Sequence, residues 1–85
     1  MEIKNKKMNI KDVKILSEMS NEGVKVIKWY VNDGEIIKEG QILVLLESGE
    51  FTMELDSEFN GKINLILREG EIGITNDVLC KIQLK

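Results

Sequence analysis

The 85-residue chain contains no histidine, no proline and only one cysteine, Cys80. Without histidine it has neither an imidazole base nor a histidine ligand for a metal. Because Cys80 has no second cysteine to pair with, we interpret it as an apolar strand residue in a reducing compartment. We expect no nucleophilic role for its thiol, since no histidine can activate it. These absences predict a protein that is not an enzyme.

Long hydrophobic runs are absent as well. The longest apolar run covers residues 42–46, far short of the ~20 residues that a membrane-spanning helix needs. The N-terminal residues include lysines but no apolar signal core. We therefore expect a cytoplasmic protein with no membrane contact.

Positive charge is scarce after the first residues. Residues 1–11 carry four lysines and one glutamate, so residues 12–85 carry 8 basic and 14 acidic side chains, a net charge of −6. An acidic domain repels phosphate backbones, which argues against a nucleic-acid partner. We predict a flexible basic N-terminal arm over residues 1–11 and one domain over residues 12–85.

Short apolar segments separated by turn residues predict an all-β domain. No segment has apolar residues at helical spacing over three turns. Turns are indicated by Asn-Asp-Gly at 32–34, Glu-Gly at 39–40 and 69–70, and Asn-Gly at 60–61. The expected strands cover residues 13–16, 24–31, 36–37, 42–46, 53–55, 63–67, 72–74 and 78–84.

The chain also contains an internal repeat with a period of 36 residues. The segment Asp-Gly-Glu-Ile at 33–36 aligns with Glu-Gly-Glu-Ile at 69–72, and Gly40 aligns with Asn76. Asparagine is the other residue type that tolerates a left-handed backbone. Since neither copy can bury its apolar face alone, we expect the two copies to pack about a pseudo-twofold axis. The predicted product is a flattened β-barrel or sandwich of two antiparallel sheets.

The central feature is a hairpin in residues 43–55, where two β-type runs flank the polar segment 47–50. Gly49 fits the sharp reversal because glycine adopts positive φ without a steric penalty. The carboxylate of Glu50 therefore stands at the tip. We expect this tip at one end of the barrel and both ends of the chain at the other.

Residues 13–83 resemble the lipoyl/biotinyl domain family, in particular the lipoyl domains of 2-oxo acid dehydrogenase acyltransferase subunits. The resemblance is carried by the repeat, the turn spacing, and the segments 24–35, 40–43, 47, 52–55, 57, 61 and 70–71. It implies a barrel-sandwich hybrid whose hairpin tip presents one lysine, where lipoate or biotin is attached as an amide.

The chain departs from the family pattern at that tip. A lipoyl domain usually has Asp-Lys-Ala there and a biotinyl domain Met-Lys-Met, whereas this chain has Gly49-Glu50-Phe51. A carboxylate cannot be acylated by activated lipoate or biotin, because the reaction needs an amine nucleophile. The nearest lysines, Lys38 and Lys62, adjoin different turns. We therefore expect no cofactor; lipoate or biotin is expected only if this interpretation is wrong.

The hairpin tip and the loop that precedes residue 23 supply the candidate docking residues. The resemblance implies that the loop 17–22 lies beside the tip. Glu50 is either a solvated tip residue or an acidic docking contact, and Phe51 is either a binding anchor or a ring folded back onto the barrel rim. We expect no metal site, because the glutamates lack an evident convergent geometry. The candidates are Glu47, Ser48, Gly49, Glu50, Phe51, Glu54, Glu18 and Asn21.

These observations favour a lipoyl/biotinyl-like domain that acts non-enzymatically as a protein-interaction, scaffold or regulatory module of a multienzyme complex. Its predicted partner is a protein of a 2-oxo acid dehydrogenase or biotin carboxylase assembly. The alternative is a lipoyl or biotin carrier domain of a 2-oxo acid dehydrogenase complex or biotin-dependent carboxylase whose lysine has been replaced.

Overall fold

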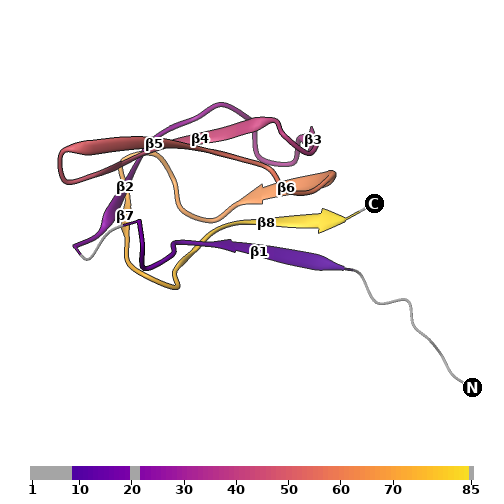
Figure 1. The fold of residues 1–85 in the computed structure, drawn as a ribbon. Helices are drawn as coiled ribbons and strands as arrows, with labels where there is room; N and C mark the ends of the chain where they lie inside the picture. Colours follow the sequence, from indigo (N-terminus) through magenta and orange to yellow (C-terminus); the bar gives the residue numbers. More distant parts are fainter. Residues whose placement is uncertain (1–8, 20–21, 85) are drawn as a thin grey trace, which may run out of the picture.

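The computed structural model describes residues 9–19 and 22–84. They form two four-stranded antiparallel sheets, with the orders β1-β8-β6-β3 and β5-β4-β2-β7 (Figure 1). This arrangement confirms the predicted all-β architecture of two antiparallel sheets. Over the described ranges, no helix is long and apolar enough to cross a membrane. The strands are β1 (Ile10–Lys14), β2 (Val24–Trp29), β3 (Ile36–Ile37), β4 (Ile42–Ser48), β5 (Phe51–Asp56), β6 (Gly61–Leu65), β7 (Ile72–Gly73) and β8 (Val78–Leu84).

The first strand differs in position from the one that the sequence pattern predicts. The pattern places it at residues 13–16, but β1 begins at Ile10 and ends at Lys14. Its position is set by pairing with β8, which puts Ile10 opposite Gln83. Val13 is the one half-buried residue of β1, so local hydrophobicity is a weak guide to this edge strand. Residues 1–8 of the predicted basic arm lie outside the described part of the chain.

Strands that correspond to each other in the 36-residue repeat lie in different sheets. The strands β2, β3 and β4 correspond to β6, β7 and β8, and each strand lies in the opposite sheet from its counterpart. The backbone repeats as well, since Gly40 has a φ of 89° and its counterpart Asn76 has a φ of 78°. Both values lie in the left-handed region that glycine and asparagine tolerate best. The predicted pseudo-twofold relation therefore holds for the strand order and for this turn.

Two equivalent hydrogen bonds join the halves, and we call them the crossed clasps. The Glu69 carboxylate accepts the backbone N–H of Trp29 at 2.9 Å. The Asp33 carboxylate accepts the backbone N–H of Leu65 at 2.8 Å. The two acceptors are 36 residues apart in the sequence, and so are the two donors. Because each bond joins one copy to the other, the clasps hold the copies in register.

The core lies between the sheets and includes Trp29 and Cys80. Trp29 is 8% exposed, and its indole N–H donates to the carbonyl oxygen of Leu67 at 2.8 Å. Cys80 is buried, and burial raises the pKa of its thiol to about 12. The apolar interpretation of Cys80 is therefore confirmed. The buried hydrophobic residues are Ile15, Val24, Val26, Trp29, Val31, Ile37, Leu43, Val44, Leu46, Ile63, Leu79, Cys80 and Ile82.

The hairpin and the ends of the described chain lie at opposite ends of the fold. The turn between β4 and β5 is at the left in Figure 1, whereas β1 begins and β8 ends at the right. Ile10 pairs with Gln83, and the backbone N–H of Leu84 donates to the Asn9 carbonyl oxygen at 2.8 Å. This geometry displays the hairpin tip away from the chain ends, as expected for the described residues.

Candidate functional site

The hairpin tip is a two-residue turn. Strand β4 continues to Ser48 and β5 begins at Phe51, and these two residues face each other across the ladder. Gly49, at the first central position of the turn, has a φ of 60°. A Cβ atom added to Gly49 would meet nothing within 4 Å, so it is the backbone angle and not crowding that requires glycine here. Glu50 is exposed at the second central position.

Phe51 continues a row of inward-facing side chains beyond the end of the core. Residues two apart on a strand share a face, and Leu55 and Met53 are half buried against the core. Phe51 is the next residue in that row, but 72% of it is exposed. The ring therefore does not fold back onto the barrel rim. Its cross-strand neighbour Ser48 is only 8% exposed. At the tip, the last residue of β4 is therefore buried and the first residue of β5 is exposed.

A shallow groove of about 330 Å³ separates the tip from the loop that follows β1. The loop contributes Glu18, Met19 and Glu22, and the hairpin contributes residues 48–51. The structure thus brings the loop beside the tip, and Glu18, Glu50 and Phe51 line one groove. The candidate Asn21 lies outside the described residues.

Two of the candidate glutamates lie on another face. Glu47 is paired with Lys25 on one side and Thr52 on the other, and all three are exposed on the outer surface of the sheet. Glu54 accepts a hydrogen bond from the Tyr30 hydroxyl at 3.2 Å. The pKa of the Tyr30 hydroxyl is raised, mainly by partial desolvation and to a smaller extent by this hydrogen bond. Neither Glu47 nor Glu54 lines the groove, so the candidate glutamates are divided between two surfaces.

Met19 is a groove residue that the sequence analysis missed. Its sulfur accepts the backbone N–H of Leu16 at 3.5 Å, which holds the side chain beside the tip. The available signal was a lone apolar side chain in an otherwise polar loop. Methionine is flexible and polarisable, so it forms an adaptable groove wall.

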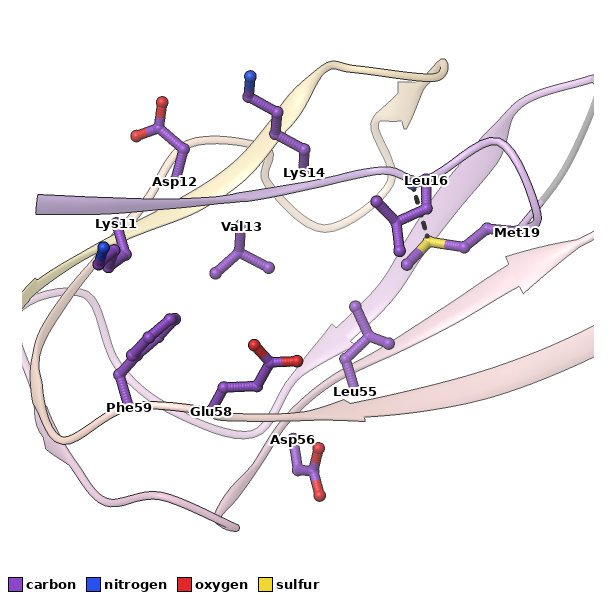
Figure 2. A pocket seen from close by; sticks show the side chains of 10 residues that line it. All are labelled: Lys11, Asp12, Val13, Lys14, Leu16, Met19, Leu55, Asp56, Glu58 and Phe59. Carbon is purple, nitrogen blue, oxygen red and sulfur yellow. Dashed lines mark hydrogen bonds between the residues drawn. The ribbon is translucent and has the colours of Figure 1, made fainter.

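Met19 also borders a second hollow, of about 340 Å³, between the edge strands β1 and β5. Figure 2 shows Val13 and Leu55 facing one another across it, with Phe59 and Lys11 at one end. The Lys11 ammonium lies 6.0 Å from the centre of the Phe59 ring. Val13, Leu55 and Phe59 are half buried and pack against the core, so this hollow is the margin of the core along the seam between the sheets.

The arrangement provides contact surface and charge at the tip. No group of three or more potential metal-ligating side chains occurs among the residues that the structure describes. The hairpin strands and their turn, residues 42–56, contain no lysine. The tip therefore offers a carboxylate and an aromatic ring, and no side-chain amine.

Comparisons with known proteins agree with the fold. The dihydrolipoyllysine-residue acetyltransferase components of the pyruvate dehydrogenase complexes of Staphylococcus aureus and Staphylococcus epidermidis are each 28% identical over 68 residues. The match covers 79% of this chain but only 16% of those relatives. The solution structure of the lipoyl domain of the 2-oxoglutarate dehydrogenase complex from Azotobacter vinelandii superposes with a TM-score of 0.69 and 24% identity. That superposition covers 82% of this chain and 94% of the Azotobacter domain.

A family model decides the assignment. The biotin/lipoyl model, described as "Biotin-requiring enzyme", matches residues 13–82, which is most of the chain. The matched range begins inside β1 and ends inside β8, so it includes the hairpin and all of the strands from β2 to β7. The chain therefore belongs to the biotin/lipoyl attachment domain family and has its lipoyl-domain fold.

Proposed function

We propose that this domain binds protein partners without carrying a prosthetic group, as a scaffold or regulatory module of a multienzyme complex. The names of its relatives make the 2-oxo acid dehydrogenase assemblies the first candidate partners, and a biotin carboxylase assembly is the second candidate. Fold alone does not determine function, so the proposal rests on the chemistry of the hairpin tip.

The observation that carries the proposal is the carboxylate at the tip. Attachment of lipoate or biotin forms an amide, which requires a side-chain amine as nucleophile. Glu50 has no amine, and residues 42–56 contain no lysine. The residues present therefore do not fit a covalently attached lipoyl or biotinyl group. A domain that keeps the displayed hairpin but not the amine retains the capacity to be recognised by proteins.

The first experiment is a modification assay. The chain is co-expressed with a lipoate ligase and with a biotin ligase, and its intact mass is recorded. The lipoyl domain of the 2-oxoglutarate dehydrogenase complex from Azotobacter vinelandii serves as the positive control. We expect the mass of this chain to stay unchanged while the control gains one lipoyl group. An added lipoyl or biotinyl group on this chain would overturn the proposal.

The second experiment installs the family pattern. The triple variant Gly49→Asp, Glu50→Lys, Phe51→Ala restores a lysine on the same two-residue turn. We expect the lipoate ligase to modify this variant, because the fold that displays the tip is retained. Modification would indicate that the ligase-recognition surface is intact and that the residues at the tip alone prevent carrier function. No modification of a folded triple variant would show that recognition has diverged further.

A further inference from the structure

We propose that Phe51 is an aromatic anchor that inserts into an apolar socket on a partner protein, and that lysine or arginine side chains border the socket. This inference rests on the proposed function and specifies the partner's chemistry. Phe51 has the highest exposure, 72%, of the large hydrophobic side chains in the described ranges. Large aromatic side chains of this kind dominate the affinity of many protein interfaces.

The position of Phe51 argues that its exposure is a feature of the hairpin's geometry. The hairpin projects past the core, so the inward row of Leu55, Met53 and Phe51 ends in the groove instead of against the opposite sheet. Across the groove stand only loop residues, among them the half-buried Met19. Phe51 therefore contributes little to folding and remains available to a partner.

The ladder orders the backbone of Phe51 before binding. Strands β4 and β5 are paired from Ile42 opposite Asp56 to Ser48 opposite Phe51. The turn contains only Gly49 and Glu50. Since the backbone of Phe51 is already ordered, binding costs little additional conformational entropy. An aromatic side chain on an ordered backbone is suited to act as an anchor.

The charges of the groove select the partner. Glu18 and Glu50 line the groove together with Phe51, and no lysine or arginine lines it among the described residues. A basic border around the socket is therefore complementary, whereas nucleic-acid phosphates are repelled. A second copy of the chain is disfavoured too, because residues 12–85 carry a net charge of −6.

The structure supplies matched control positions. Glu47 and Glu54 lie in the same hairpin but on the outer face of the sheet. Ile72 in β7 is also highly exposed, at 65%, and does not line the groove. Substitutions of Glu47 and Glu54 make the same change in charge, and a substitution of Ile72 removes a comparable exposed apolar side chain, at positions that the proposed anchor does not use.

The experiment measures binding of the full chain to the pyruvate and 2-oxoglutarate dehydrogenase complexes and to a biotin carboxylase assembly, each purified from the host organism. A label attached beyond β8, which ends at the opposite end of the fold from the tip, avoids the groove. We expect Phe51→Ala to raise Kd about 30-fold, the effect of a hot-spot aromatic residue. We expect Ile72→Ala to change Kd less than about twofold. Glu18→Gln with Glu50→Gln should lower the association rate about threefold to tenfold at low salt, and Glu47→Gln with Glu54→Gln should not.

Each other outcome counts against a specific part of the proposal. If the wild-type chain binds none of these assemblies, the proposed function fails and the inference fails with it. If the wild-type chain binds and Phe51→Ala binds equally well, the proposed function stands but the anchor is refuted. If sedimentation shows that the wild-type chain dimerises and Phe51→Ala does not, the socket belongs to a second copy and the basic partner is refuted.

Discussion

Removing one crossed clasp tests whether the two repeat copies depend on each other. Glu69→Ala deletes the carboxylate that accepts the Trp29 backbone N–H at 2.9 Å. A hydrogen bond to a charged group contributes about 1.5–3 kcal/mol, and the exposed position of Glu69 places this one at the lower end because water can replace it. We therefore expect a loss of about 1.5 kcal/mol in the free energy of unfolding. For a domain of this size, that loss lowers Tm by about 6–12 °C.

The assay is urea denaturation followed by the fluorescence of Trp29, the single tryptophan. Glu69→Gln keeps an oxygen acceptor without charge and should lose about half as much stability as Glu69→Ala. The control is Arg68→Ala, which removes an exposed ion pair of 3.9 Å with Asp33 and should cost less than about 0.5 kcal/mol.

The equivalent clasp provides an independent check. Asp33→Ala deletes the acceptor of the Leu65 N–H and should cost about as much as Glu69→Ala, because the two bonds have nearly equal lengths. If either alanine variant unfolds at the same urea concentration as the wild-type chain, the clasps do not join the halves. If Glu69→Gln is as destabilising as Glu69→Ala, charge and not the hydrogen bond is the cause.

Three further expectations concern stability. Phe51→Ala should leave the urea midpoint unchanged, because the ring is 72% exposed. Leu46→Ala, at a fully buried position, should lower the free energy of unfolding by about 2–5 kcal/mol. Equal effects of the two substitutions would refute the assignment of Phe51 to the surface. Asn76→Gly should leave the free energy of unfolding unchanged or raise it. Asn76→Ala should lower it by about 1 kcal/mol or more, because the φ of Asn76 is 78°. An alanine variant as stable as the wild-type chain would contradict the left-handed turn. Burial raises the pKa of Cys80 from 9.0 to about 12, so the unfolded thiol ionises first, and the contribution of Cys80 to stability should be constant below about pH 8 and fall between pH 9 and 12. In equilibrium unfolding, Cys80→Ala should lack this loss of stability between pH 9 and 12. If the free energy of unfolding of Cys80→Ala falls with pH as steeply as that of the wild-type chain, the prediction is refuted.

The fold was predictable because its signals are local and repeated. The alternation of apolar residues, the turn residues and the 36-residue period predict eight strands in two halves, and Gly40 with Asn76 marks equivalent turns. The position of β1 was not predictable, because its edge is defined by pairing with β8 and not by its own hydrophobic pattern.

The candidate site was predictable only in part, because side-chain direction in a hairpin depends on register. A polar segment at 47–50 does not specify whether the turn has four residues or two. The two-residue turn sets Glu47 opposite Thr52, which directs both outward, and it leaves Phe51 in the inward row. The groove with Met19 could not be foreseen either, since it joins segments about 30 residues apart.

By itself, the sequence determined the class of architecture, the doubled pattern and the absence of an amine from the hairpin, because these depend on residue types and their spacing. Tertiary structure alone decided which carboxylates share a surface with Phe51 and which face away. It did so because a shift of one residue in strand pairing exchanges the two faces of a sheet, and long-range contacts select the register.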